Sequence, residues 1–285
     1  MIKLRFIYTS DVHGDKRKYL KLIDLCKEYD IDKIVVGGDL FAKHAKERIP
    51  MQIAFINDFL RDYYKKLLDH GITYIGIVGN DDLIVPCEKY YEMIKEFPNV
   101  HDVDGKKFDI DGYSFIGSSY VLDAPFKRKD HIAIEDGQEM PQQKSDIIYI
   151  EKCQKEISVD EWREYRKKYV PKMKDILENL PKPTVGNKVI YILHDPPANV
   201  GLDFCRDGAK PGSKDIYRFL EKSNAYMSLH GHIHESYNLS NVWKAKIGKT
   251  IAVQAGQSEL DENYFVYVVV DTDKDTCERF VINWK

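Results

Sequence analysis

The sequence Leu4-Arg5-Phe6-Ile7-Tyr8-Thr9-Ser10-Asp11-Val12-His13 joins a short apolar run to an Asp-x-His motif. The aromatic and β-branched residues Phe6, Ile7 and Tyr8 favour a buried strand. Asp11 and His13 carry side chains that bind metal ions in many proteins. The stretch therefore predicts a strand with candidate metal ligands just beyond its carboxyl end.

Four further apolar runs also lead directly into polar residues. Functional sites of open α/β sheets lie outside the carboxyl ends of the strands, so these residues are expected to converge although they are far apart in the chain. In order, Lys33–Gly38 precedes Asp39, Thr73–Gly79 precedes Asn80 and Asp81, Val189–Leu193 precedes His194, and Tyr226–Leu229 precedes His230, His232 and His234.

Short apolar runs alternate with longer amphipathic ones in the first third of the chain. This alternation predicts strands joined by helices, and hence an α/β fold in which helices cover the faces of a largely parallel sheet. The predicted strands are Leu4–Tyr8, Lys33–Val36 and Thr73–Val78, and the predicted helices are Lys16–Tyr29, Ile49–His70 and Cys87–Glu96.

The later part of the chain is predicted to consist mostly of β-strands. Asp111-Gly112 suits the two positive-φ positions of a tight hairpin between Lys107–Ile110 and Tyr113–Gly117. Ser213 is placed to cap a helix. Three further strands are predicted around Ile251, Phe265 and Phe280.

The chain is predicted to form a single domain, 1–285, with an insertion at about 122–185. The insertion begins with a polar stretch of no clear period, and we expect its segment from about Leu122 to Ser158 to act as a lid that restricts substrate size. Ser158 and Glu161 form a capping-box pattern that opens a helix, which Pro171 is expected to kink or split. The basic residues Lys127-Arg128-Lys129 are interpreted as a solvated face, with contact to an anionic substrate or nucleic acid as the alternative.

The candidate ligands are two carboxylates, one amide oxygen and four imidazoles. This nitrogen and oxygen set suits Mn²⁺, Fe, Zn²⁺ or Co²⁺, with manganese favoured, rather than Ca²⁺. Seven side chains are too many for one ion and suit a pair of ions about 3.5–4 Å apart. Such a pair generates a hydroxide at neutral pH and binds the oxygens of a phosphoryl group during its displacement. The five cysteines are far apart and fit reduced thiols rather than disulfides or a thiolate site.

The ordered motifs D-x-H, G-D, G-N-x-[D/E], H and G-H-x-H resemble the calcineurin-like metallophosphoesterase superfamily, and most closely its small prokaryotic phosphoesterases and phosphodiesterases. The resemblance implies a two-sheet sandwich flanked by helices. It also implies hydrolysis of phosphoesters by a metal-bridging hydroxide, with Asn80 helping to hold metal and substrate. The implied ligands are Asp11, His13 and His234 for one metal, Asn80, His194 and His232 for the other, and Asp39 as the bridge.

Asp81 departs from the family pattern, which usually has a histidine after the asparagine. A carboxylate beside two dications is a poor proton donor and is expected to repel anionic substrates, which favours phosphodiesters over monoesters. The alternative is that Asp81 points away from the site. His230 is interpreted as a structural histidine. His44 is interpreted as a solvated loop residue, with a place over the site as the alternative.

Two other function classes remain open on the sequence alone. A scaffold that has lost turnover would bind partner proteins, but the retention of all seven ligands argues against it. A nuclease, or any nucleic-acid partner, is disfavoured by the net charge of -3 and the pI near 6.3. The expected partner is a small phosphoester, with the oligomeric state left open. Lys3 and Arg5 interrupt the first apolar run and no later run suits a membrane span, so we expect a cytoplasmic protein.

Overall fold

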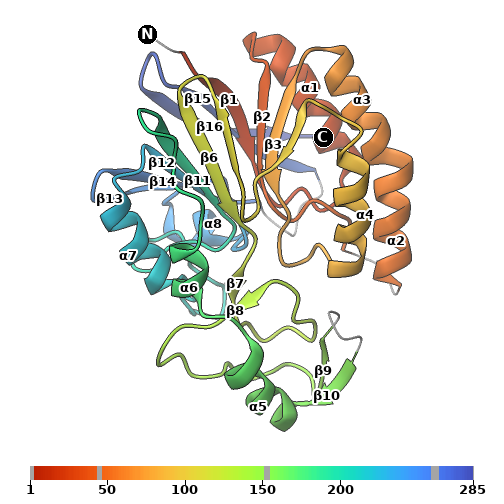
Figure 1. The fold of residues 1–285 in the computed structure, drawn as a ribbon, viewed down its shortest axis with the longest axis vertical. Coiled ribbons are helices and arrows are strands. Elements are labelled where there is room, and N and C mark those ends of the chain that lie inside the picture. Colours follow the sequence, from red (N-terminus) through yellow and green to blue (C-terminus); the bar gives the residue numbers. More distant parts are fainter. Residues whose placement is uncertain (1–2, 44–46, 151–154, 258–262, 285) are drawn as a thin grey trace.

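The computed structural model describes residues 3–43, 47–150, 155–257 and 263–284. Two six-stranded sheets pack face to face, and helices cover their outer faces (Figure 1). The first sheet has the order β16-β15-β1-β2-β3-β4, in which β1 to β4 are parallel and β15 and β16 are antiparallel to their neighbours. Its strands are β1 (Arg5–Thr9), β2 (Lys33–Gly37), β3 (Thr73–Ile77), β4 (Val100–Asp102), β15 (Tyr264–Asp271) and β16 (Thr276–Asn283).

The second sheet has the order β13-β14-β12-β11-β6-β5. Its four central strands are parallel, and each edge strand is antiparallel to its neighbour. Its strands are β5 (Lys107–Ile110), β6 (Tyr113–Ser118), β11 (Lys188–Leu193), β12 (Met227–His230), β13 (Lys244–Ile247) and β14 (Thr250–Gln254).

Strand alternation builds a separate apolar layer on each face of the first sheet. Phe6 and Tyr8 of β1 point into the core between the sheets, whereas Ile7 points into the core under the helices. Phe6 meets Phe115 of the opposite sheet edge to face, with ring centroids 6.0 Å apart. The helices are α1 (Lys16–Tyr29), α2 (Arg48–Phe55), η1 (Ile56–Leu60), α3 (Arg61–Asp69) and α4 (Ile84–Ile94) on the first sheet, and α6 (Met173–Glu178), α7 (Lys214–Ser223) and α8 (Ser236–Ser240) around the second.

Several local predictions are confirmed. Asp111 and Gly112 have φ angles of 49° and 71°, as a tight hairpin between β5 and β6 requires. The Ser213 side chain accepts a hydrogen bond from the backbone N–H of Ile216 and caps α7. The helix predicted over Ile49–His70 is present as α2, η1 and α3, with a π-helical turn in its middle.

The insertion is more regular than the sequence predicted. Besides β7 (Val121–Leu122) and β8 (Ile132–Ala133), it contains the antiparallel pair β9 (Ile147–Ile150) and β10 (Lys155–Ser158). The capping box at Ser158 opens α5 (Val159–Tyr169), and the chain at Pro171 separates α5 from α6 as predicted. The sequence analysis did not predict these strands because few residues of the segment are apolar. The small apolar core of the insertion includes Val121, Ile148 and Trp162.

Lys129 corrects the interpretation of Lys127-Arg128-Lys129 as a solvated face. Its ammonium is buried and contacts Asp123 Oδ1 at 2.8 Å, Gln143 Oε1 at 2.7 Å and the carbonyl of Ala124. Asp123 Oδ2 also lies 2.8 Å from Arg166 Nε of α5 and accepts a hydrogen bond from the Trp162 indole. Charged residues therefore form the polar centre of the insertion, where each compensates another.

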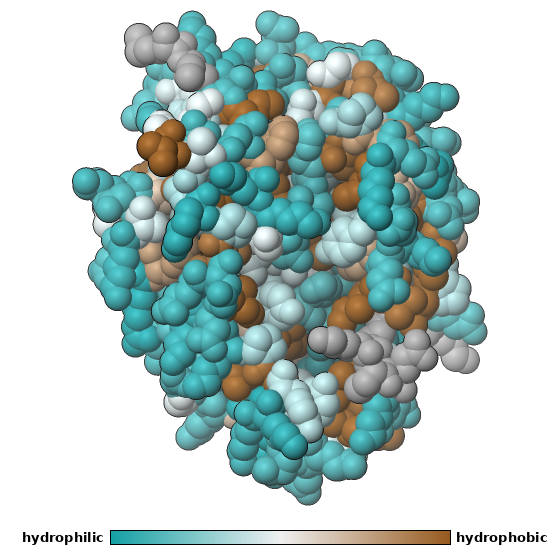
Figure 2. All heavy atoms as spheres, viewed as in Figure 1, coloured by the Kyte–Doolittle hydropathy of each residue, from teal (hydrophilic) through white to brown (hydrophobic). Residues whose placement is uncertain are grey.

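The outer surface agrees with the charged composition. The face in Figure 2 is mostly hydrophilic, with smaller groups of hydrophobic side chains among the polar ones. Within the described ranges, no helix is both long and apolar enough to cross a bilayer. Four cysteines, Cys26, Cys87, Cys205 and Cys277, are free thiols as predicted, and Cys153 lies outside the described residues.

Candidate metal centre and substrate pocket

Backbone turns with positive φ direct the candidate ligands inward. Asp11, His13, Asp39 and His232 have φ angles of 55°, 43°, 53° and 67°. Residues other than glycine rarely adopt this region, and such strain collects at functional sites. The loops after β1 and β2 are joined by hydrogen bonds from Asp11 N to the Gly38 carbonyl (3.0 Å) and from His13 N to the Asp39 carbonyl (2.9 Å). Two separate strand ends therefore form one structural unit.

Gly79 lets the loop after β3 approach that unit. A Cβ at this position would collide with the backbone and carboxylate of Asp39. Asp82, three residues later, is fully buried and accepts hydrogen bonds from the backbone N–H groups of Leu40, Phe41 and Gly79 at 2.7–2.8 Å. Its carboxylate thus fastens the loop after β3 to the loop after β2. The sequence analysis did not assign this role to Asp82.

Asp11, His13, Asp39 and His234 form a group that is suited to a divalent metal ion. One donor atom from each lies within 4.8 Å of all the others. His13 Nε2 and His234 Nε2 are 3.0 Å apart, and His234 Nε2 lies 3.1 Å from Asp11 Oδ1. Neighbouring ligands at about 2.1 Å from one ion are themselves separated by about 3 Å, so these spacings fit metal coordination.

A second group of donors surrounds the amide oxygen of Asn80. This oxygen lies 2.8 Å from His232 Nδ1 and 3.2 Å from His194 Nε2. Asp39 belongs to both groups, because its Oδ1 is 3.4 Å from His194 Nε2 and its Oδ2 is 3.5 Å from His13 Nε2. The structure thus brings together all seven predicted ligands, with Asp39 in the middle.

Burial and mutual charge set the protonation of the ligands. Burial lowers the pKa of His13, and it lowers that of His232 to about 3. Burial opposes ionisation of Asp11 and Asp39, but His234 beside Asp11 and His194 beside Asp39 hold both carboxyl pKa values below their usual range. Ionised carboxylates and neutral imidazoles are the forms that bind metal ions.

His194 is oriented by the backbone. Its Nδ1 lies 2.7 Å from the carbonyl of Gly37, which fixes the proton on Nδ1 and directs Nε2 toward Asp39 and Asn80. Burial disfavours the imidazolium, but the charge of Asp39 outweighs burial and raises the pKa of His194 to about 10. A cation at Nε2 would take the place of this proton.

His230 has the predicted structural role. It is fully buried, its Nδ1 lies 2.9 Å from the carbonyls of both Leu193 and Asp195, and its Nε2 lies 2.9 Å from Ser228 Oγ. These contacts join β12 to the loop that carries His194.

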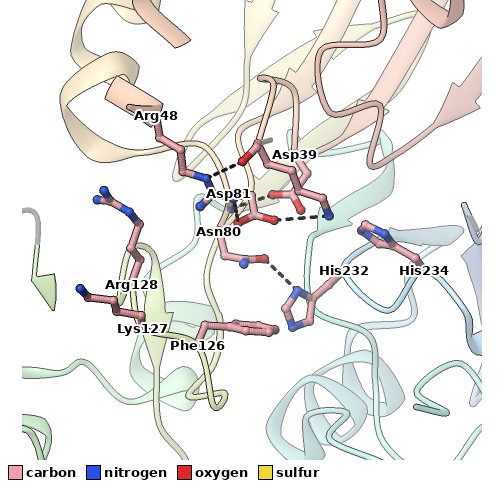
Figure 3. Close-up of a pocket in the computed structure, with 10 residues that line it drawn as sticks. Asp39, Arg48, Asn80, Asp81, Phe126, Lys127, Arg128, His232 and His234 are labelled. Carbon is pink, nitrogen blue, oxygen red and sulfur yellow. Dashed lines mark hydrogen bonds and ion pairs between the residues drawn. The ribbon is translucent and has the colours of Figure 1, made fainter. Parts of the chain in front are cut away.

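Asp81 is paired with cations, so its charge is compensated by neighbours that the sequence analysis did not consider, and its effect on anionic substrates stays a prediction. Arg48 Nη2 donates a hydrogen bond to Asp81 Oδ1 at 3.0 Å (Figure 3), and Lys43 Nζ lies 3.7 Å from Asp81 Oδ2. The backbone N–H of Asp81 donates to Asp39 Oδ1 at 2.9 Å. The sequence analysis missed Lys43 and Arg48 because no motif marks them, and His44 lies outside the described residues.

A pocket of about 390 Å³ opens beside these ligands. The insertion contributes Phe126, Lys127 and Arg128 to its wall, and Lys127 is exposed, in agreement with the interpretation as a solvated face. Phe126 is 44% exposed, and its ring meets that of His232 edge to face with centroids 6.4 Å apart. Figure 3 shows Lys127 and Arg128 on the side of the pocket away from His234.

Comparison with known proteins agrees with this architecture. No curated protein sequence matches the chain. Among solved structures, the TT1561 protein of Thermus thermophilus is 18% identical with a TM-score of 0.56, and the alignment covers 97% of both chains. A dimetal phosphatase from Danio rerio is 10% identical with a TM-score of 0.51, and the alignment covers 99% of both. At these identities the likeness concerns the fold alone.

The family model for calcineurin-like phosphoesterases matches residues 4–236, which extend from the first strand to just beyond the last candidate ligand. The same residues contain β1 to β4 of the first sheet, β6, β11 and β12 of the second, and all seven ligand positions. The chain therefore belongs to the calcineurin-like phosphoesterase family.

Proposed function

We propose that the protein is a metal-dependent phosphoesterase that holds two divalent cations, with manganese favoured. The observation that carries this proposal is the position of Asp39 between two groups of donors, within 3.5 Å of both His13 and His194. Bound cations at such a centre acidify water and neutralise charge on phosphoryl oxygens. Asp11, His13 and His234 would hold one cation, and Asn80, His194 and His232 the other.

The chain's own residues would position the substrate beside this centre. The pocket places the Asn80 amide, Lys43 and Arg48 around the space next to Asp39. Charge-assisted hydrogen bonds from Lys43 and Arg48 would stabilise the phosphoryl oxygens and orient the ester for displacement. Phe126, on the insertion side, would exclude water from the same space.

We further propose that phosphodiesters with acidic leaving groups are the preferred substrates. The support is chemical, because position 81 holds a carboxylate already bonded to Arg48 instead of an imidazole that protonates a leaving oxygen. Among the lining residues that the structure describes, His232 and His234 are the histidines, and both are proposed ligands.

Hydrolysis of two chromogenic esters tests this function. Purified protein is stripped of metal, reconstituted with Mn²⁺, and assayed with bis(p-nitrophenyl) phosphate and p-nitrophenyl phosphate. We expect metal-dependent turnover with higher kcat/KM on the diester, and strong loss in Asp39→Asn but not in the exposed variant Arg163→Gln. Absence of turnover with full metal content would instead favour a non-catalytic scaffold. Faster cleavage of single-stranded oligonucleotides than of either ester would favour a nuclease.

A further inference from the structure

The pocket carries more positive charge than one phosphoryl group needs. Its described lining contains four cationic side chains, Lys43, Arg48, Lys127 and Arg128, and two carboxylates, Asp39 and Asp81. Among the described lining residues the cations thus outnumber the carboxylates, and Lys127 is also paired with Glu156 of the insertion. The whole chain is acidic, with a net charge of -3, so this excess is local and concentrated in the pocket.

The cations fall into two sets that come from different parts of the fold. Lys43 and Arg48 lie beside Asp81, close to the ligand centre, and the Arg48 guanidinium is also tied to the Lys43 carbonyl by a 2.8 Å hydrogen bond. Lys127 and Arg128 belong to the insertion and lie farther from His232 and His234 (Figure 3). A ligand that used both sets would extend from the centre toward the insertion.

The insertion holds Lys127 and Arg128 in a fixed backbone. The N–H of Tyr149 donates to the Lys127 carbonyl at 2.9 Å, and the N–H of Lys129 donates to the Tyr149 carbonyl at 3.1 Å. The Arg128 guanidinium stacks over the Tyr149 ring, 4.6 Å from its centroid. The buried Lys129–Asp123 pair anchors the next residue. The wall is thus preformed, which lowers the entropic cost of binding.

We infer that Lys127 and Arg128 form a subsite for a second phosphoryl group, so that the substrates are phosphoesters with two linked phosphoryl groups. This inference rests on the proposed function, because the first group is the one at the ligand centre. Lys127 Nζ lies 3.4 Å from Glu156 Oε1 in an exposed pair, which a bound phosphoryl group would replace at little cost. Arg128 supplies the planar donor set that suits phosphoryl oxygens.

Direct binding to the Mn²⁺-loaded protein tests the subsite. Isothermal titration calorimetry compares methylphosphonate, methylenediphosphonate and phosphonoacetate on wild type, on the double variant Lys127→Gln/Arg128→Gln, and on Arg163→Gln, which removes an exposed cation of the same insertion. Each ligand also chelates Mn²⁺ in solution. This effect is the same for every protein titrated with that ligand at buffered free Mn²⁺, so it cancels when the proteins are compared. We expect the double variant to bind methylenediphosphonate about tenfold more weakly, with a much smaller loss for methylphosphonate and no change in Arg163→Gln.

Each outcome decides the inference. Equal losses for methylphosphonate and methylenediphosphonate, no loss for either, or the same loss in Arg163→Gln would overturn the subsite. A larger loss for phosphonoacetate than for methylenediphosphonate would overturn the assignment to a phosphoryl group in favour of a carboxylate. Turnover of the chromogenic esters is measured in parallel. Selective weakening without any turnover keeps the subsite and rejects the phosphoesterase proposal, whereas turnover without selective weakening rejects the subsite alone.

Discussion

Arg48 of α2 donates a hydrogen bond to Asp81 Oδ1 across 3.0 Å, although Arg48 begins the helix that follows β2 and Asp81 lies in the loop after β3. The pair joins the amino end of a helix to the residue that follows Asn80. Gln52, one turn further along α2, donates to the Asp81 carbonyl at 2.8 Å and supports the same contact. Asp81 is therefore a residue that positions cations at the pocket.

The pairing predicts that Arg48 and Asp81 act as one unit. We expect Arg48→Gln and Asp81→Asn each to lower kcat/KM for bis(p-nitrophenyl) phosphate about tenfold, and the double variant to lose little more, because either change breaks the same contact. A double-mutant cycle on kcat/KM measures the coupling. Arg48→Lys, which keeps the charge, should recover part of the activity. Strictly additive losses would show that Asp81 does not position Arg48.

The second prediction concerns metal content. Because Asp39 lies between both donor groups, Asp39→Asn should lower the occupancy of both cations, whereas His234→Ala and His194→Ala should each lower mainly one. Elemental analysis after Mn²⁺ reconstitution measures the number of ions per chain, with the exposed variant Asp58→Asn as control. A wild-type protein that holds a single ion in excess Mn²⁺ would contradict the binuclear proposal.

The third prediction concerns the polar centre of the insertion. Asp123→Ala would leave Lys129 and Arg166 buried without their carboxylate, which should destabilise the insertion by about 3–5 kcal/mol. Asp160→Ala, which removes the exposed partner of Arg163, is the matched control and should have no measurable effect. Urea unfolding gives the stability, and limited proteolysis locates the change. Cleavage rates within 122–185 that are equal in both variants would refute the role of Asp123.

The fourth prediction concerns the pH dependence contributed by His230. Burial lowers the pKa of this histidine to about 4, below the ordinary value near 6.5, although the carbonyls of Asp195 and Leu193 favour the charged form. The contribution of neutral His230 to the free energy of unfolding is therefore complete above pH 6.5. It is lost as the pH falls toward 4, by about 3 kcal/mol in all. Metal-free His230→Gln protein should lose less stability over this interval than metal-free wild type. Parallel curves of unfolding free energy against pH for the two proteins would disprove this role of His230.

The sequence alone determined the strand and helix pattern of the first third of the chain and the candidate ligands. A period of two in Leu4–Tyr8 and a longer period in Lys16–Tyr29 are local properties, and local patterning is sufficient to place such elements. Asp11, Asp39, Asn80 and His194 could be selected because each directly follows an apolar run. The carboxyl ends of parallel strands meet at one edge, so their convergence also followed from the sequence.

Only the tertiary structure decided what surrounds those ligands. Lys127 and Lys129 stand two positions apart in one basic run, yet one lines the pocket and the other is buried against Asp123. Asp81 was expected to act by its own charge, but Arg48, which is distant in the chain, compensates it. The charge a side chain presents depends on neighbours brought by folding, and a carboxylate of unknown partner has no predictable effect on a substrate.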